Sequence, residues 1–449
     1  MKDIDIEKFN NIHFIGIGGI GVSAIAKMML LLGKKVSGSD LSESEITKEL
    51  VLAGATISMG HRSENLPEST NLVVYTVIIP ENNPEFSLAI ERGIKILSYP
   101  EVLGLISAHK KTIAVSGTHG KTTTTAMIAK IFLDAGKDPT VVVGSKLLEQ
   151  KSNFVAGKGE PASTRGDSSM RGGYFIVEAC EYKHSFLNIN PTIAVITNID
   201  NDHLDYYKDI DDIISAFHEF ADKVPKDGYI IADLSDKNTV KALGGIKAKI
   251  IDFSQLGGFA SKLDLKAPGE HNRKNAAVAL AVANVIGIPL KTTRLSLVAF
   301  SGTWRRFEYK GTMKNGALVY DDYAHHPTEI KETILGAREK FPDKKVTIIF
   351  QPHLYSRTKI LFDDFVSALS MADKVIVTDI YAAREPNDFS INGKILADAI
   401  SEKNKNILYI SKFEDIVHEI KNSADSDDLI ITMGAGDVYK IEEKLVGGI

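Results

Sequence analysis

The sequence predicts an α/β protein in which parallel sheets are covered by helices. Short apolar strands alternate with helical stretches along the chain, and two glycine-rich turns each lie between an apolar strand and a helix. A third observation is the length, because 449 residues are too many for one hydrophobic core and predict two to four domains of about 100–200 residues. The pattern of elements favours three domains, at residues 1–107, 108–302 and 303–449.

Composition and charge narrow the class of protein. Apolar residues make up 44% of the chain and charged residues 25%, as in globular proteins. The net charge of −5 provides no basic surface for nucleic acid or for an anionic membrane. Cys180 is the only cysteine, which excludes an internal disulfide and suits a reducing compartment, and we expect its thiol to be structural and partly buried. The charged N-terminus lacks a signal-peptide core, and the apolar stretches are too short to span a membrane. We therefore expect a cytoplasmic protein without membrane insertion; its oligomeric state is open, with a homodimer among the assemblies that the sequence allows.

The first glycine-rich turn, Gly16-Ile17-Gly18-Gly19-Ile20-Gly21, follows a predicted strand at 12–15 and precedes a predicted helix at 22–32. It fits the fingerprint of a dinucleotide-binding turn, in which backbone N–H groups and a helix N-terminus bind a diphosphate. Asp40 ends the next predicted strand, where an acidic residue can meet a ribose hydroxyl. The turn therefore indicates either a dinucleotide such as NAD or a nucleotide-diphosphate sugar. The same domain is completed by a strand at 71–76, a helix at 83–92 and a strand at 94–97.

The second glycine-rich turn, at 117–125, is a phosphate-binding loop between an apolar strand at 112–116 and a helical stretch at 126–132. Its glycines let backbone N–H groups face phosphates, Lys121 can reach the β- and γ-phosphate oxygens, and the Thr122 hydroxyl can hold Mg²⁺. The usual spacing would place a glycine where Val115 stands, so the loop is a shortened variant. It predicts a nucleoside triphosphate site in the second domain. The loop residues expected to bind the nucleotide are Gly117, Thr118, His119, Gly120, Lys121, Thr122 and Thr123.

Polar residues follow the next two strands of this domain, which are predicted at 174–178 and 193–197. Glu178 ends the first of them and is either a solvated acid or a Mg²⁺ ligand beside Thr122. The second strand is followed by Asp200, Asp202, His203 and Asp205. Within this cluster, His203 is either a surface histidine or a ligand of a second metal or of the γ-phosphate.

Three further segments complete the second domain. Residues 156–173 are rich in glycine, serine and charge and predict a mobile surface loop, and residues 243–265 predict irregular structure. An alanine-rich helix is expected at 272–286. Asn272 is either its N-cap or an amide that reads an adenine base, and the sequence leaves both roles open.

The third domain again alternates strands and helices. Arg305 and Arg306 at its start are either a solvated basic pair or a clamp for ATP phosphate. The polar segments 321–329 and 351–358 each follow a strand, and their histidines and Arg357 suit the recognition of an amino acid's carboxylate. The strands are predicted at 317–320, 345–350, 374–378, 407–410 and 429–432.

In this order, the motifs resemble those of the Mur ligase family over nearly the whole chain. The resemblance implies an N-terminal Rossmann-like domain that binds a UDP-sugar, a central P-loop ATPase domain with a mostly parallel sheet, and a C-terminal Rossmann-like domain that binds an amino acid. It implies that ATP phosphorylates the lactyl carboxylate of UDP-N-acetylmuramate and that the amine of L-alanine attacks the acyl phosphate, in the synthesis of a peptidoglycan precursor. The matching segments are 16–21, 38–40, 83–85, 117–125, 197–205, 271–275, 305–307, 321–329 and 351–358.

The resemblance also implies roles for single residues. The implied catalytic residues are Lys121, Glu178, His203, His325 and Arg357, with His325 as a base for the ammonium. The implied Mg²⁺ ligands are Thr122 and Glu178, with His203 on a second Mg²⁺. Beyond the loop, the implied ATP contacts are Asn272, Asn275, Arg306 and Asp321. The UDP end is implied to contact Gly18, Gly19, Ile20, Gly21, Ser39, Asp40 and His61. The alanine pocket is implied to consist of Tyr323, His325 and Arg357.

Four positions depart from the family pattern. Leu354 stands where many relatives have an arginine, and Thr76-Val77 stand where many have serines. Phe217 stands where several sister ligases carry a modified lysine that bridges metals, so no such modification is expected.

Other functions are compatible with parts of the sequence. A murein-peptide ligase, which joins a recycled tripeptide to the same sugar, would differ mainly in the C-terminal pocket. A nicotinamide-dependent oxidoreductase would explain the N-terminal glycines but would leave the Lys121 loop without a role. A non-catalytic nucleotide sensor would not need the complete set of Lys121, Thr122, Glu178 and His203.

Overall fold

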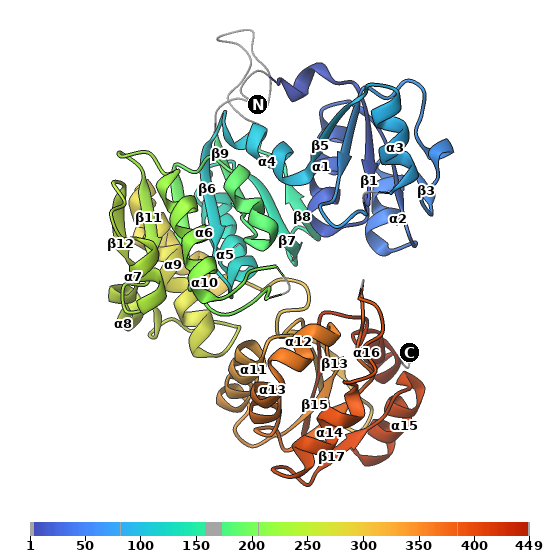
Figure 1. The fold of residues 1–449 in the computed structure, drawn as a ribbon. Helices are drawn as coiled ribbons and strands as arrows, with labels where there is room; N and C mark the ends of the chain where they lie inside the picture. The colour runs from blue at the N-terminus through green and yellow to red at the C-terminus, as the bar shows by residue number, and fades with distance from the viewer. Residues whose placement is uncertain (1–3, 81, 158–172, 205, 384, 448–449) are drawn as a thin grey trace. The chain divides into compact units, whose positions relative to one another are not determined.

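The computed structural model describes residues 4–80, 82–157, 173–204, 206–383 and 385–447. These residues form three mostly parallel sheets, coloured in sequence order in Figure 1, and the predicted α/β class is confirmed. The chain forms two compact units: Met1–Ala260 with Asn275–Phe300, which holds the first two sheets, and Ser261–Lys274 with Ser301–Ile449, which holds the third.

The first sheet is entirely parallel and has the order β3-β2-β1-β4-β5. The strand order reverses at β1, so the glycine turn that follows β1 lies at the switch point where α/β sheets bind ligands. The strands are β1 (Asn11–Ile15), β2 (Lys35–Asp40), β3 (Thr56–Met59), β4 (Leu72–Tyr75) and β5 (Lys95–Ser98). The helices are η1 (Ile6–Lys8), α1 (Ile20–Leu31), α2 (Glu45–Leu52), η2 (Ser63–Asn65), α3 (Pro84–Glu91) and α4 (Tyr99–Ser107).

The second sheet has the order β12-β11-β10-β6-β9-β7-β8, and its β7–β8 pair is antiparallel. Because β6 lies between β10 and β9, the residues that follow these three parallel strands meet at one edge of the sheet. The strands are β6 (Lys111–Ser116), β7 (Thr140–Leu147), β8 (Ser152–Val155), β9 (Tyr174–Glu178), β10 (Ile193–Ile196), β11 (Tyr229–Ala232) and β12 (Lys249–Asp252). The helices are α5 (Lys121–Asp134), η4 (Tyr182–Asn188), α6 (Ile210–Asp222), α7 (Lys237–Ala242), η5 (Phe253–Leu256), α8 (Gly257–Ala260), α9 (Glu270–Ile286) and α10 (Leu290–Ala299).

The third sheet has the order β13-β14-β18-β15-β16-β17. Its edge strand β13 is antiparallel to β14 and was not among the predicted strands. The strands are β13 (Glu308–Thr312), β14 (Leu318–Asp322), β15 (Lys345–Phe350), β16 (Lys374–Val377), β17 (Ile407–Tyr409) and β18 (Asp428–Met433). The helices are α11 (Pro327–Lys340), α12 (Tyr355–Ile360), α13 (Phe362–Leu369), α14 (Gly393–Ser401), α15 (Phe413–Ser423) and α16 (Lys440–Val446).

The first two sheets share one buried apolar cluster, which includes Ile25 of α1 and Phe175 of β9. A polar contact joins them as well, because Asn153 of β8 donates hydrogen bonds to the carbonyl of Ile20 and, at 2.9 Å, to the hydroxyl of Ser23. The hairpin of β7 and β8 therefore supports the start of α1, the helix that follows the first glycine turn.

One sequence prediction for the second domain differs from the structure. Residues 243–265 are not irregular throughout, since they contain β12, η5 and α8. The edge strand β12 has only four residues and two of them are exposed, so it lacks the apolar run that identifies a buried strand. The predicted loop at 156–173 lies largely outside the described residues.

Candidate active site

The phosphate loop joins β6 to α5, and its backbone requires glycine at two positions. Gly117 and Gly120 have φ angles of +128° and +81°, in the region that favours glycine. A Cβ atom at Gly117 would lie 2.0 Å from the hydroxyl of Thr197, and one at Gly120 would lie 2.5 Å from Oδ1 of Asn275. Neighbouring polar side chains therefore lie directly against the loop.

The loop is held by the residues that follow β10. The backbone N–H of His119 donates to Oδ1 of Asn198 at 3.0 Å, and the hydroxyl of Thr197 donates to the carbonyl of His119 at 2.6 Å. The ring of His119 lies 3.1 Å from the carboxylate of Asp200. These contacts tie the loop to the segment that follows β10, and the sequence alone did not reveal the contact of Asn198.

Lys121 is the first residue of α5, and its ammonium makes three hydrogen bonds. It donates to the carbonyls of Gly117 at 2.6 Å and Thr118 at 3.0 Å, and to Oε1 of Glu181 at 2.9 Å. Burial opposes the charged ammonium, but the negative charge of Glu181 outweighs it and raises the pKa of Lys121. Lys121 is therefore a fixed positive charge at the phosphate loop.

Glu181 is a residue beside the phosphate loop that the sequence analysis did not single out. It is 2% exposed and lies in the loop after β9, where it pairs with Lys121. Its second oxygen, Oε2, is buried and has no hydrogen-bond partner among the described residues. The only available signal was its position three residues beyond Glu178, at the carboxyl end of a strand next to the phosphate loop.

Thr122 and Glu178 are brought together as the sequence predicted. The hydroxyl of Thr122 lies 3.0 Å from Oε1 of Glu178, and Oε2 accepts a hydrogen bond from the backbone N–H of Gly144 at 2.7 Å. Two neighbouring ligands of an octahedral Mg²⁺ ion lie about 3.0 Å apart when each Mg–O distance is about 2.1 Å. The separation and the hard oxygen donors of this pair therefore fit Mg²⁺.

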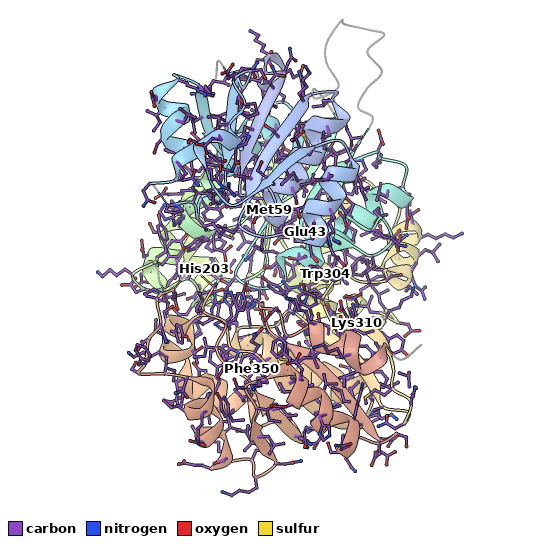
Figure 2. All side chains as sticks on the ribbon, turned by 90° about the vertical axis from the view of Figure 1, so that its right-hand side faces the viewer. Glu43, Met59, His203, Trp304, Lys310 and Phe350 are labelled. Carbon is purple, nitrogen blue, oxygen red and sulfur yellow. The ribbon has the colours of Figure 1, made fainter. Side chains whose placement is uncertain are left out.

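His203 lies beside Glu181 rather than in a regular element, and Figure 2 labels its side chain. Its Nε2 is 3.8 Å from Oε1 of Glu181 and 3.9 Å from Oδ2 of Asp202, and its ring packs against Tyr182. Its φ of +54° lies in the left-handed region, which is uncommon for a residue other than glycine. Asp205, the last acid of the predicted cluster, lies outside the described residues.

One prediction for a single residue of this domain is wrong, and one of the two roles left open for Asn272 is excluded. Cys180 is exposed rather than partly buried. Asn272 is not an N-cap, because α9 begins two residues earlier at Glu270. The side-chain amide of Asn272 instead donates to the carbonyl of Pro268 at 2.7 Å. One turn further along α9, Oδ1 of Asn275 accepts from the hydroxyl of Thr124 at 3.1 Å.

The glycine turn after β1 is held by the end of β2. The backbone N–H groups of Gly16 and Ile17 donate to the carbonyl of Ser39 at 2.9 and 3.0 Å. Asp40 accepts from the backbone N–H of Gly18 at 2.8 Å, so in this structure its carboxylate supports the turn. Gly19 and Ile20 continue the turn into the start of α1.

The structure shows why Gly21 is a glycine and which residues Ser39 and His61 contact. A Cβ atom at Gly21 would lie 2.6 Å from the hydroxyl of Tyr99, so this glycine makes room for a tyrosine of α4. Ser39 and His61 are in contact, with 2.9 Å between Oγ and Nδ1, and both contact Glu85. Glu85 is the second residue that the sequence analysis missed, because it was noted only as part of the segment 83–85.

The predicted alanine-pocket residues form a connected group in the C-terminal unit. Nδ1 of His325 lies 3.0 Å from the carbonyl of Tyr323, and their rings are 5.3 Å apart. His353 links this pair to Arg357: its ring is 5.9 Å from that of His325, and its Nδ1 is 3.3 Å from Nη1 of Arg357. Leu354, at the position of the missing arginine, is a buried side chain with a φ of +69°.

The two arginines at the start of this unit have different environments. The guanidinium of Arg305 is 3% exposed and donates to Asp321 at 2.7 Å and to the carbonyls of Gly436 and Gly434 at 2.9 and 2.6 Å. Arg306 lies over the ring of Tyr323 at 5.1 Å. Arg305 is therefore a structural ion-pair partner rather than a solvated residue. The other oxygen of Asp321 accepts from Thr432 at 2.7 Å, so both oxygens of this predicted ATP contact are engaged.

The fold and the site define an α/β protein with two glycine-rich turns. The turn after β6 has the pattern of a loop that binds nucleoside triphosphates, and the turn after β1 has the pattern of one that binds a diphosphate. Three family profiles match the chain: the Mur ligase family, catalytic domain, at residues 11–111; the Mur ligase middle domain, at 115–263; and the Mur ligase, glutamate ligase domain, at 305–436. The chain belongs to the Mur ligase family, as the sequence predicted. The predicted enzyme class, an ATP-dependent ligase that forms an amide bond, is thereby confirmed.

Relatives match over the full length of the chain. A protein named UDP-N-acetylmuramate–L-alanine ligase from Caldanaerobacter subterraneus is 41% identical over 470 aligned positions, which cover 99% of each chain. The crystal structure of a UDP-N-acetylmuramate–alanine ligase from Thermotoga maritima is similar with a TM-score of 0.79 and 28% identity, covering 97% of this chain and 98% of that one. A murein peptide ligase from Psychrobacter arcticus gives a TM-score of 0.70 and 28% identity, covering 98% and 99%. Among the described helices, none has the length and apolar character needed to cross a membrane.

Proposed function

We propose that this enzyme joins L-alanine to the lactyl carboxylate of UDP-N-acetylmuramate in the synthesis of a peptidoglycan precursor, through an acyl phosphate made from ATP. The observation that carries the proposal is the full-length match to a ligase of that name at 41% identity. The intact phosphate loop supports it, because phosphorylation of a carboxylate requires positive charge at the migrating phosphoryl group.

In the ATP site, Lys121 supplies the fixed positive charge, and the backbone N–H groups of residues 117–123 supply the hydrogen bonds. Thr122 and Glu178 would hold one Mg²⁺, and His203 would be the ligand of a second; bound Mg²⁺ neutralises phosphate charge. A γ-phosphate oxygen competes with Glu181 for the ammonium of Lys121, since that ammonium already makes three hydrogen bonds. Asn272, Asn275, Arg306 and Asp321 remain proposed contacts for the rest of ATP.

In the alanine site, Arg357 would bind the carboxylate of the amino acid and His325 would remove a proton from its ammonium. A carbonyl only accepts hydrogen bonds, so the contact with Tyr323 places the proton of a neutral His325 on Nδ1. The other ring nitrogen, Nε2, is then the atom that accepts a proton from the substrate. The amine lone pair released in this way attacks the acyl carbon, and phosphate leaves.

We assign these tasks to three domains, with UDP-sugar binding at 1–107, ATP binding at 108–302 and amino-acid binding at 303–449. The proposed UDP-sugar contacts are Gly18 to Gly21, Ser39, Asp40 and His61. We also propose a cytoplasmic location, which suits a chain with a single cysteine. Sedimentation of the full chain tests whether the protein is a homodimer.

The second candidate is a murein-peptide ligase, which the similarity to the Psychrobacter arcticus structure favours. The two functions differ in the amine substrate, so one assay separates them. Release of phosphate from ATP is measured with UDP-N-acetylmuramate and either L-alanine or the tripeptide. We expect turnover with L-alanine that needs the UDP-sugar as well. Fast hydrolysis of ATP with neither the UDP-sugar nor an amine contradicts the ligase proposal. Turnover with UDP-N-acetylmuramate and the tripeptide, but not with UDP-N-acetylmuramate and L-alanine, supports the second candidate.

A further inference from the structure

Glu85 is a completely buried carboxylate in the first turn of α3. Asn83, the N-cap of that helix, accepts from the backbone N–H groups of Glu85 and Phe86 at 3.0 and 3.1 Å. Burial by itself disfavours the charged form, but hydrogen bonds from His13, Ser39 and Asn65 outweigh it and lower the pKa of Glu85. The nearby helix N-terminus favours the negative charge as well.

The carboxylate of Glu85 gathers donors from separate parts of the domain. Oε2 accepts from Nε2 of His13 on β1 at 2.8 Å and from the hydroxyl of Ser39 on β2 at 2.6 Å. Oε1 accepts from Nδ2 of Asn65 at 3.1 Å and from Nδ1 of His61 at 3.2 Å. The backbone N–H of Arg62 donates to Oε1 at 3.2 Å as well. One ionised group therefore determines how these donors are oriented.

The orientation of His61 follows from this arrangement. An ionised carboxylate only accepts hydrogen bonds, so Nδ1 of His61 has to carry a proton. That proton lies between Oε1 of Glu85 and the hydroxyl oxygen of Ser39, which is 2.9 Å from Nδ1. The ring nitrogen that remains for a ligand is Nε2, and the side chain of His61 is 13% exposed. Ser39 in turn holds the glycine turn through its carbonyl, which accepts from Gly16 and Ile17.

We propose that Glu85 is a positioning residue for the UDP-sugar: it fixes Ser39 and His61 in the orientation that binds the ligand. The inference rests on the proposed function, in which Ser39 and His61 contact UDP-N-acetylmuramate. Glu85 itself is buried and does not touch the ligand. Its effect on binding is therefore transmitted through these two side chains, and this separates a positioning role from a general contribution to stability.

The test uses the full chain and the variant Glu85→Gln. The amide of glutamine brings its own N–H donors against the donors that surround it, so the group loses its orientation. We expect the Kd for UDP-N-acetylmuramate, measured by calorimetry, to rise about 10- to 100-fold, the scale for hydrogen bonds to a charged group. The kcat at saturating UDP-sugar and the KM values for ATP and L-alanine are expected to change less than about twofold.

Two further variants test whether Glu85 acts by positioning Ser39 and His61 or only by stabilising the fold. Glu101→Gln is the matched control, because Glu101 is a helix-capping carboxylate of the same domain that accepts from Ser98. It is expected to lower the Tm but to leave the Kd for the UDP-sugar unchanged. The second is the double substitution Ser39→Ala with His61→Ala. In that background Glu85→Gln is expected to change the Kd less than about threefold, because the side chains through which it acts are gone.

The outcomes separate this inference from the proposed function. If the unsubstituted protein does not bind UDP-N-acetylmuramate, the proposed function and this inference both fail. If it binds and Glu85→Gln leaves the Kd unchanged, or raises it by the same factor in both backgrounds, this inference alone fails. Should Glu85→Gln not fold, Asn65→Ala removes one donor and keeps the carboxylate. It is then expected to raise the Kd roughly 2- to 10-fold, and an unchanged Kd overturns the inference.

Discussion

Lys121 and Glu181 form a nearly buried ion pair, with 2.9 Å between Nζ and Oε1, at the place where the phosphate loop meets the loop after β9. The lysine that should bind phosphate therefore already has an anionic partner inside the protein. Because the side chains are only 14% and 3% exposed, neither charge is well solvated once the pair is broken. This relationship makes the stability of the domain and its affinity for nucleotide depend on each other.

The first prediction concerns Glu181→Gln. The substitution leaves the ammonium of Lys121 without a counter-charge, and removal of one partner of a buried pair costs about 3–5 kcal/mol. We expect a lower Tm for the free protein. ATP with Mg²⁺ then supplies the missing negative charge, so the rise in Tm on adding them should be larger in the variant than in the unsubstituted protein. Differential scanning calorimetry with and without nucleotide measures both values.

The control for this prediction is Glu149→Gln, which breaks a pair between Lys130 and a glutamate that is 35% exposed in the same domain, while Lys130 keeps its second partner Asp134. Loss of a solvent-accessible partner costs about 0–1 kcal/mol, so this variant should keep the Tm and its normal response to ATP. An equal rise in Tm with ATP for Glu181→Gln and for the unsubstituted protein would contradict the prediction.

The second prediction is that Lys121→Ala abolishes ligation and leaves binding of the UDP-sugar intact. The two glycine turns belong to different sheets, so loss of charge at one should not reach the other. We expect turnover to fall by at least about 100-fold, the scale for one preorganised charge stabiliser. Calorimetry with UDP-N-acetylmuramate is the second measurement, and a loss of affinity there would show that the assignment of the two sites to separate domains is wrong.

The third prediction concerns Arg357→Ala. A small amino acid offers little apolar area, so its carboxylate must supply much of the binding energy, and a charge-assisted pair contributes about 1.5–3 kcal/mol. The KM for L-alanine should therefore rise roughly 10- to 100-fold, while the KM values for ATP and the UDP-sugar stay constant. The side chain of Leu354 has neither a charge nor a hydrogen-bond donor, so it cannot replace the guanidinium of Arg357. An unchanged KM for L-alanine would remove Arg357 from the proposed pocket.

The fourth prediction is a pH dependence of stability in the C-terminal unit. Burial, together with the charge of Asp321, raises the pKa of Glu442 to about 7, although the ion pair with Lys310 acts in the opposite direction. The folded state thus holds a proton that the unfolded chain releases near its ordinary pKa of 4.5. The proton on Glu442 therefore contributes at most about 3 kcal/mol to the free energy of unfolding. This contribution is fully present below pH 4.5 and is lost as the pH rises to 7 and above.

The variant Glu442→Gln tests this dependence, because glutamine does not titrate. The fall in Tm between pH 5 and pH 8 should be smaller in Glu442→Gln than in the unsubstituted protein. Glu443→Gln, an exposed neighbour on the same helix, should keep the original fall. Identical pH profiles for all three proteins would show that Glu442 does not hold the proton.

The sequence predicted the parts of this molecule that have a local signature. Strands such as Lys345–Phe350 are mostly apolar and are buried beyond their first residue, as expected for parallel strands covered on both faces. A glycine-rich turn between a strand and a helix is typical of a phosphate site. Thr122 and Glu178 could be paired because Glu178 ends β9, and Thr122 lies in the first turn of the helix that follows the loop after the neighbouring strand β6. The domain boundaries and the roles of the site residues stay predictions.

The residues that were missed depend on tertiary contacts. Glu85 meets Ser39 and His13 only after α3 has packed beside β1 and β2, and nothing in the segment 83–85 indicates those partners. Glu181 has a role only because Lys121 folds back toward it. Asparagine is a residue type that is common at N-caps, but α9 begins two residues before Asn272, directly after Gly269, which has a φ of +95°.

During synthesis, the phosphate loop leaves the ribosome long before the residue against which it packs. Asn275, whose amide lies against Gly120 and Thr124, is made 150 residues after Thr125. At about 5–20 residues per second, translation of that interval takes roughly 8–30 s. The strands β6, β9 and β10 can pair in this time, but the turn at Gly120 lacks its neighbour. In a nascent chain the phosphate loop therefore acquires this neighbour only after more than half of the chain has been translated.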